Sequence, residues 1–245
     1  MKAKKELAEM LIGSLKGERE SWEKSLVKCK ADKLTVEGDI LICSGIMAYL
    51  GVFIKSYREE CVANWVKMLE KFQIKSSETV DLNEILGDQV KIVGWTSNGL
   101  PSDAFTIENA IIMDHSERWS LMIDPQMQAN KWLKQQYRAQ REEDQNVVVV
   151  KPTMDQKVMS RQLEASITLG NPVIFEDAIE SFDPMLDPLL SKQIEKKSSE
   201  TLIKFGEKMI PFADDFKFFI TTKMPAPHYS PEVCVKVTIL NFMVT

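Results

Sequence analysis

The first 34 residues repeat an apolar position about every four residues, and Lys and Glu are the commonest residues at the other positions, with no proline. This spacing predicts one long helix with a narrow apolar seam. The seam suits either an antiparallel coiled coil, whose partner helix would lie elsewhere, or a surface helix of the same domain. In the first case we expect the helix to project from the rest of the chain. The seam consists of Leu7, Leu11, Leu15, Trp22, Leu26 and Cys29.

A second helical stretch is predicted over residues 37–73. Its first half is almost wholly apolar and should be buried, whereas residues 57–72 are amphipathic. A short helix is predicted over residues 81–86, ending at Gly87 as a C-cap. Residues 90–101 contain several glycines, an asparagine and a proline, so the sequence favours a loop there.

From residue 120 onward, short apolar runs alternate with helical segments. Strands separated by helices of 10–15 residues predict an α/β fold with a five-stranded parallel sheet and flanking helices. Two further runs around Gly206 predict an inserted hairpin. The expected strands are residues 120–123, 147–150, 172–175, 217–221 and 237–244; the expected helices are 127–141, 155–169 and 185–195; the hairpin is 201–205 with 209–212.

The first predicted strand runs into a tight loop and then a helix. P-loop proteins carry G-x-x-x-x-G-K-[ST] at this place, where glycines wrap the phosphates, Lys reaches the β- and γ-phosphates, and Ser/Thr holds magnesium. The corresponding segment here is Asp124, Pro125, Gln126, Met127, Gln128, Ala129, Asn130, Lys131 and Trp132.

This loop can be aligned with the P-loop motif in two ways, and in both alignments residues of the motif are replaced. If Asp124 takes the first glycine position, Asn130 replaces the lysine and Lys131 replaces Ser/Thr. If Pro125 is first, Lys131 matches but Trp132 replaces Ser/Thr. Neither alignment supplies a hydroxyl for magnesium, and in the first a carboxylate repels the phosphate. We therefore expect Lys131 to pair with a loop carboxylate.

The third and fourth predicted strands end in polar residues. Glu176 and Asp177 invert the Asp-Glu order of a Walker B strand, which displaces both carboxylates by about a methylene, and hydrolysis is sensitive to misplacement of about 1 Å. The alternative interpretation is an acidic loop edge. Thr221 and Thr222 stand where a sensor of the γ-phosphate is expected.

Composition and charge exclude several function classes. The four cysteines form no C-x-x-C pair and there are only two histidines, so no metal site is predicted. A net charge of −5 gives no reason to expect nucleic-acid binding. The longest uncharged run, residues 40–54, is too short for a membrane span. No catalytic residues are predicted, and His228 is interpreted as structural.

Several stretches resemble the dynein heavy-chain family, and the degraded phosphate loop is itself part of the resemblance. Residues 17–19, 22, 38–39, 49–51 and 57–58 resemble the returning stalk helix and its junction with the motor ring. The segments that resemble the fifth AAA+ module are residues 98–103 with 107–109, 118–126 with 128–132, 186–190, and 220–223 with 227–229, 231–232 and 236–238. Met127 departs from the family, which usually has glycine there.

The resemblance implies a domain organisation and a role. Residues 1–75 would be the returning stalk helix and junction helices, and residues 76–245 the large subdomain of the fifth AAA+ module without its helical lid, in a fragment of a longer chain. The sheet order should be 5-1-4-3-2. The implied partners are the neighbouring AAA+ modules, the outgoing stalk helix and, through the stalk tip, the microtubule. The implied location is the cytoplasm and cytoskeleton, in the axoneme of a cilium.

The expected function is that of a structural, force-transmitting module of a microtubule motor, with no cofactor and no activity of its own, although the parent chain is an ATPase. One alternative is an active ATP-binding module, since Lys131, Glu176, Asp177 and Thr221 leave polar groups around the pocket. A coiled-coil scaffold would leave the α/β pattern unexplained.

Overall fold

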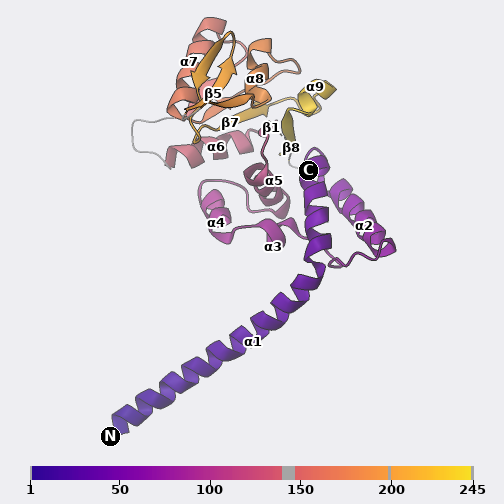
Figure 1. The fold of residues 1–245 in the computed structure, drawn as a ribbon, viewed down its shortest axis with the longest axis vertical. Helices are drawn as coiled ribbons and strands as arrows, with labels where there is room; N and C mark the ends of the chain where they lie inside the picture. The colour runs from indigo at the N-terminus through magenta and orange to yellow at the C-terminus, as the bar shows by residue number, and fades with distance from the viewer. Residues whose placement is uncertain (1, 140–146, 198–199, 244–245) are drawn as a thin grey trace. The chain divides into compact units, whose positions relative to one another are not determined.

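The computed structural model describes residues 2–139, 147–197 and 200–243 (Figure 1). The chain forms two compact units. The first comprises Met1–Ser44 with Cys61–Val80, and the second comprises Gly45–Glu60 with Asp81–Thr245. In the described part of the chain, no helix is both long and apolar enough to cross a membrane.

The first unit is helical. Helix α1 spans Lys2–Gly45, and α2 spans Lys55–Lys71, with its part from Cys61 in this unit. Asp39 accepts hydrogen bonds from the backbone N–H (2.7 Å) and the hydroxyl (2.8 Å) of Ser77, which fixes the segment after α2 against α1. Gly38 permits this approach, since a Cβ there would lie 2.4 Å from the carbonyl oxygen of Lys75.

The long helix was predicted correctly, but the break expected between residues 34 and 37 is wrong. Helix α1 continues without interruption to Gly45, because the residues at the expected break include no proline and no capping pattern. From residue 17 to residue 34 every side chain of α1 is exposed.

The second unit begins with the π-helix η1 (Ile46–Leu50) and the first turns of α2, followed by α3 (Leu82–Leu86), α4 (Gln89–Ser97) and α5 (Ala104–His115). The loop predicted over residues 90–101 is therefore wrong over its first eight residues. Asp88 caps α4 by accepting from the backbone N–H groups of Val90 and Lys91, and the helix tolerates Gly94. Helix α5 was not predicted at all.

A parallel sheet of five strands forms the centre of this unit. Its strands are β1 (Trp119–Ile123), β2 (Val148–Val150), β3 (Val173–Phe175), β7 (Phe218–Thr222) and β8 (Val237–Asn241). The strands are all parallel and lie in the order β8-β1-β7-β3-β2. When the five predicted strands are numbered 1 to 5 along the chain, this is the predicted order 5-1-4-3-2, which is confirmed. Helices α6 (Gln128–Ala139) and α7 (Gln156–Leu169) follow β1 and β2, and the short α9 (Pro231–Cys234) precedes β8.

The predicted hairpin is present within a larger antiparallel sheet. Strands β5 (Glu200–Phe205) and β6 (Lys208–Pro211) pair as expected, and β4 (Ile194–Lys197) adds a third strand. The helix predicted over residues 185–195 is mostly wrong. A 3-10 turn (η2, Pro184–Leu186) and α8 (Asp187–Leu190) end where Lys192 adopts a left-handed φ of 46°, and the chain then pairs with β5.

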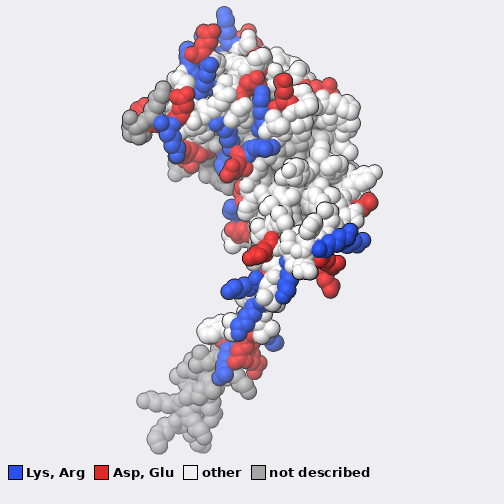
Figure 2. All heavy atoms as spheres, turned by 45° about the vertical axis from the view of Figure 1, so that its right-hand side comes forward, with Lys and Arg blue, Asp and Glu red and all other residues white. Residues whose placement is uncertain are grey.

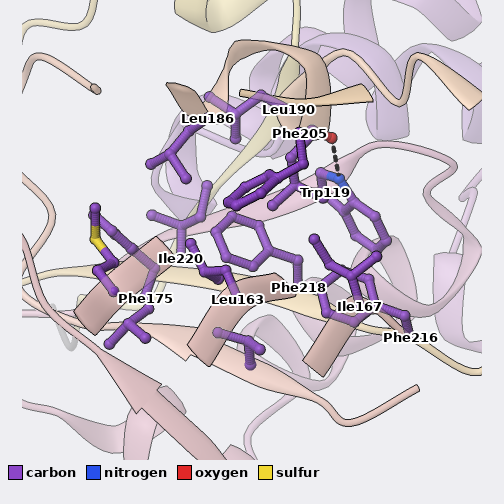
Figure 3. Close-up of a cluster of buried hydrophobic side chains, with 14 of the residues drawn as sticks. Trp119, Leu163, Ile167, Phe175, Leu186, Leu190, Phe205, Phe216, Phe218 and Ile220 are labelled. Atoms are coloured by element: carbon purple, nitrogen blue, oxygen red, sulfur yellow. Dashed lines mark hydrogen bonds between the residues drawn. The ribbon is translucent and has the colours of Figure 1, made fainter. Parts of the chain in front are cut away.

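Aromatic and aliphatic side chains together form the core on one face of the parallel sheet (Figure 3). Trp119 lies edge-on to Phe216 and to Phe218, with ring centroids 5.8 and 6.3 Å apart. Its indole N–H donates to the carbonyl oxygen of Leu189 at 2.8 Å, which ties α8 to β1. Burial of these rings holds β1, β3 and β7 in register, so that their carboxyl ends meet at one edge.

Candidate nucleotide-binding site

The loop after β1 places Asp124 at the first turn of α6. Asp124 is 2% exposed, and its two carboxylate oxygens accept hydrogen bonds from the backbone N–H groups of Gln128 (2.8 Å) and Asn130 (2.9 Å). Burial raises the pKa of Asp124, and the hydrogen bonds from the start of α6 oppose that rise. The backbone amides that a P-loop offers to phosphate therefore have an acceptor from the chain itself.

Asn130 connects α6 to the ends of β3 and β7. Its side-chain amide donates to Glu176 Oε1 at 2.9 Å and to Thr221 Oγ1 at 3.2 Å. Asn130 is 2% exposed, so this contact is part of the folded interior. Met127, which takes the place of a family glycine, adopts φ 59°, a conformation that favours glycine.

Lys131 and Trp132 do not reach the site centre. Lys131 is exposed and forms no ion pair with any described residue, so the expected pairing of Lys131 with a loop carboxylate is not found. Trp132 is buried and packs edge-on against Trp95, with centroids 6.2 Å apart. Among the remaining loop residues, Gln128 and Ala129 donate backbone hydrogen bonds to Asp124. Ala129 is buried, Pro125 and Gln128 are half-buried, and Gln126 is exposed.

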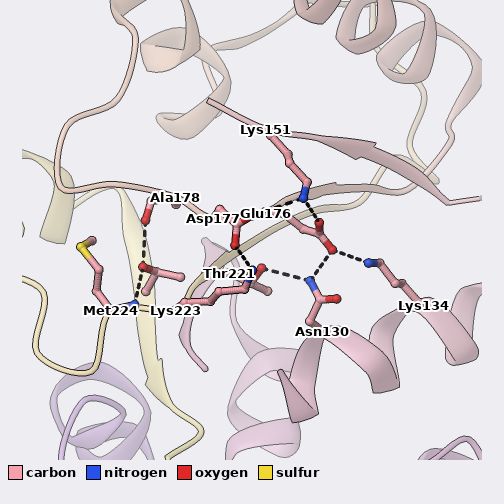
Figure 4. A network of polar contacts seen from close by, with 10 residues as sticks. Asn130, Lys134, Lys151, Glu176, Asp177, Ala178, Thr221, Lys223 and Met224 are labelled. Atoms are coloured by element: carbon pink, nitrogen blue, oxygen red, sulfur yellow. Dashed lines mark hydrogen bonds and ion pairs between the residues drawn. The ribbon is translucent and has the colours of Figure 1, made fainter. Parts of the chain in front are cut away.

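Lysines surround the two acids that follow β3 (Figure 4). Lys134, one turn beyond Asn130 in α6, makes an ion pair with Glu176 Oε1. Lys151 lies 3.2 Å from Glu176 Oε2 and 3.3 Å from Asp177, and Lys223 lies 2.8 Å from Asp177. Positive side chains thus stand beside both acids.

These ion pairs govern the titration of both acids. Burial alone would raise the pKa of Glu176, but hydrogen bonds from Lys134, Asn130 and Lys151 together hold it below its usual value. The pKa of Asp177 is lowered chiefly by Lys223, and that of Lys151 is raised by its hydrogen bonds to Glu176 and Asp177. At neutral pH the site is therefore a set of ionised pairs.

The two threonines at the end of β7 have different roles. Thr221 accepts a hydrogen bond from the side-chain amide of Asn130 at 3.2 Å. Thr222 donates from its hydroxyl to the carbonyl oxygen of Ala178 at 2.8 Å and accepts from the backbone N–H of Met224 at 3.2 Å. Thr222 therefore fixes the loops after β3 and β7 and does not point into the site.

Sequence reasoning missed the three lysines. Lys134 lies four residues after Asn130 and therefore on the same helical face. Lys151 and Lys223 each follow the carboxyl end of a strand directly, and that position was the available signal. On the face shown in Figure 2, basic and acidic side chains are interspersed, with no broad basic surface. No group of three or more metal-binding side chains occurs within the described ranges.

A parallel sheet of order β8-β1-β7-β3-β2, with a loop and helix after β1 and paired acids after β3, defines an AAA+ module. A family profile described as the ATP-binding dynein motor region matches residues 93–245, and one described as the microtubule-binding stalk of dynein motor matches residues 2–69. The chain therefore belongs to the dynein heavy-chain motor family.

Similar proteins include human dynein axonemal heavy chain 6, 39% identical over 244 residues, and human dynein axonemal heavy chain 3, 40% identical over 238 residues. The dynein-1-beta heavy chain of the flagellar inner arm I1 complex of Chlamydomonas reinhardtii is 37% identical over 245 residues. These matches cover 97–100% of this chain but only 5–6% of the relatives. The chain thus spans a small part of the length of each relative.

Proposed function

We propose that this chain acts as a nucleotide-independent, force-transmitting module of a microtubule motor. In this proposal residues 1–75 form the returning stalk helix and its junction with the ring, and residues 76–245 form the large subdomain of the fifth AAA+ module. Its partners are the neighbouring modules of the heavy chain and the outgoing stalk helix, which reaches the microtubule. The axonemal names of the relatives support a location in the cilium or flagellum.

The observation that carries the proposal is the buried carboxylate of Asp124 on the backbone amides at the start of α6. An incoming phosphate would have to displace it or lie beside a like charge, and both cost binding energy. In the alignment that starts at Asp124, Asn130 replaces the lysine and Lys131 replaces Ser/Thr, which removes a phosphate ligand and a magnesium ligand. A module fixed in one packing can couple moving neighbours to a lever, because packed units shift as rigid bodies.

The test is calorimetric titration of the 245-residue protein with ATP·Mg²⁺ and ADP·Mg²⁺, together with thermal unfolding at several nucleotide concentrations. We expect no binding heat and no nucleotide-dependent rise of the melting temperature, since a ligand that binds the folded state would stabilise it. Micromolar binding that is weakened in Asn130→Ala and kept in Lys131→Ala would overturn the proposal. It would support the alternative, an active ATP-binding module.

A further inference from the structure

A cavity of ≈ 220 Å³ lies where strands β1 and β7 begin, at the edge of the sheet opposite to the phosphate loop. Its walls include the rings of Trp119, Phe216 and Phe218, which Figure 3 shows packed close together. Pockets for drug-sized ligands usually hold about 300–1,000 Å³. This cavity therefore has room only for a small ligand, and its walls favour an apolar one.

Three basic side chains line the same cavity. They are Arg118, Lys192 and Lys217, and none of them makes an ion pair with a carboxylate in the part of the chain that the structure describes. Two acids also line the cavity: Asp214, and Asp114, which an ion pair of 2.7 Å with a lysine of α4 already neutralises. Positive charge therefore exceeds negative charge around the cavity, which favours an anion as its ligand.

Lys192 holds its charge next to the aromatic wall. It is half-buried, its Nζ lies 3.9 Å from the centre of the Trp119 ring, and it donates to the carbonyl oxygen of Glu117. An ammonium group has three N–H donors, so the bond to Glu117 leaves donors for a ligand. Burial lowers the pKa of Lys192 and the charge of Lys217 lowers it further, against the effect of Glu117. The two lysine charges are thus close enough to repel each other, and an anion beside them would relieve this repulsion.

We propose that this cavity binds a small carboxylate with a flat apolar body. The body would pack against the aromatic wall, and the carboxylate would accept a charge-assisted hydrogen bond from Lys192 near the positive charge of Lys217. A ligand with one charged end and one apolar end matches a wall that combines an ammonium group with rings, whereas inorganic phosphate would leave the rings uncovered. The site is independent of the proposed function, because the phosphate loop lies at the other end of β1.

The test uses benzoate as the probe and benzamide, which has nearly the same shape and no charge, as its matched control. Each is titrated into the ¹⁵N-labelled 245-residue protein at constant ionic strength. The indole N–H resonance of Trp119, assigned through triple-resonance experiments, is followed by NMR. We expect a saturable shift with benzoate and a Kd on the order of 1 mM, as is usual for a ligand of about ten non-hydrogen atoms. Benzamide should bind at least about tenfold more weakly, because it cannot pair with the lysines.

Four variants separate this site from general electrostatic attraction. Lys192→Met should weaken benzoate binding at least about tenfold, and Lys217→Met about threefold, because the second charge acts from a greater distance. Lys192→Arg keeps the charge and the contact with Trp119, so its Kd should stay within about threefold of the parent value. Lys196→Met, at an exposed position of β4 that does not line the cavity, should leave the Kd unchanged.

Several results would overturn the proposal. One is a Trp119 resonance that does not respond to benzoate, and another is equal affinity for benzamide, which would show that the lysines take no part. A third is an equal loss of affinity in Lys196→Met and Lys192→Met, since binding would then follow the net charge alone. If Lys192→Met does not fold, Lys217→Met decides, because this side chain is exposed, and an unchanged Kd overturns the proposal.

A further titration tests whether the ligand is a small molecule. N-acetyl-glutamate α-amide carries the carboxylate of an acidic side chain on a peptide backbone, and we expect it to bind at least about tenfold more weakly than benzoate because it lacks the flat apolar body. Tighter binding of this compound would identify an acidic side chain of another polypeptide as the occupant, and would overturn the assignment to a small carboxylate.

Discussion

The side chain of Asp124 accepts a hydrogen bond of 2.9 Å from the backbone N–H of Asn130, six residues later in the first turn of α6. Together with the bond to Gln128, this contact caps the helix from inside the loop that would surround a phosphate. The same oxygens thus cap the helix and, in the proposed function, take the backbone amides that a phosphate would need. Removing the carboxylate should therefore change both stability and anion affinity.

Asp124→Ala should lower the free energy of unfolding by about 1–2 kcal/mol, as for other helix caps. About 50 mM phosphate should restore part of this loss, because a helix N-terminus binds anions. Urea denaturation with and without phosphate measures both effects. Asp155→Ala removes the cap of α7, where Asp155 accepts from Lys157 and Val158. Equal recovery of that control in phosphate would contradict a specific anion site at α6.

The acid pair after β3 should give the stability a defined pH dependence. The folded-state pKa of Glu176 is lowered, so its contribution is complete above its unfolded pKa of about 4.3 and is lost as pH falls through the folded value. The pKa of Asp124 is raised instead, so the effect of its ionisation on the stability has the opposite sign and lowers the stability as the pH rises. Glu176→Gln should therefore be less stable than the parent at pH 7, with the gap closing as the pH falls below about 4. A gap that is constant from pH 7 to pH 3 would show that the ion pairs do not contribute.

A buried arginine holds the start of the second unit to α5. Arg58 is 3% exposed, donates to the carbonyl oxygen of Gly51 (2.8 Å) and to Asn109 Oδ1 (2.6 Å), and lies 4.4 Å from the centre of the Phe105 ring. Burial lowers the pKa of Arg58 to about 10, against the effect of Glu108, and the group stays charged at neutral pH.

Arg58→Leu should cost about 3–5 kcal/mol, since it leaves buried acceptors without a donor. Arg58→Lys should recover only part of this, because lysine lacks the forked donors and the planar contact with the ring. Lys55→Met, at an exposed position of the same helix, is the control and should change stability by less than about 0.5 kcal/mol. The stabilities are measured by guanidinium unfolding. A similar loss of stability in Arg58→Leu and in the control Lys55→Met would contradict a special role for Arg58.

Some elements of this fold could be predicted from the sequence and others could not. The difference lies in the pattern of apolar and polar residues in each element. Strands such as β2 and β3 were predictable because they are short apolar runs between turn residues, as expected of strands covered on both faces. Helix α5 was missed because Ala110, Ile111 and Ile112 are all buried, so no amphipathic period marks it. Helix α4 was missed because its glycine and polar end resemble a loop.

In the candidate site, too, some residues could be predicted from the sequence and others could not. Asp124 and the acids after β3 were found from their places next to strands in a known loop pattern. The lysines that pair with those acids were not, because each comes from a different element. Which acid a lysine meets depends on the order of β2, β3 and β7 in the sheet, and not on the distance between residues along the chain.

The exposed part of α1 should exchange its amide hydrogens quickly. Residues 17–34 have only exposed side chains, so nothing in the described chain protects this segment except its own helical hydrogen bonds. Strands β1 and β7 are buried along their whole length. In hydrogen–deuterium exchange of the 245-residue protein, the protection of β1 and β7 should be at least about a hundredfold greater than that of residues 17–34. Equal protection in both would indicate that α1 has a partner in this protein.

Two lysines three residues apart on α6 provide a direct test of how the site is held together. Lys134 makes an ion pair with the buried Glu176, whereas Lys131 is exposed and has no ion pair with a described residue. Lys134→Met should lower the free energy of unfolding by about 1–2 kcal/mol. This is less than the full cost of a broken buried pair, because the Lys134 side chain is 40% exposed and Lys151 still faces the acid. Lys131→Met should change stability by less than about 0.5 kcal/mol.

A double-mutant cycle of Lys134→Met with Glu176→Gln should give a coupling energy of about 1 kcal/mol, and the same cycle with Lys131→Met should give none. Equal coupling for both lysines in urea denaturation would mean that Glu176 responds to general charge alone. The position of Lys134 would then not matter.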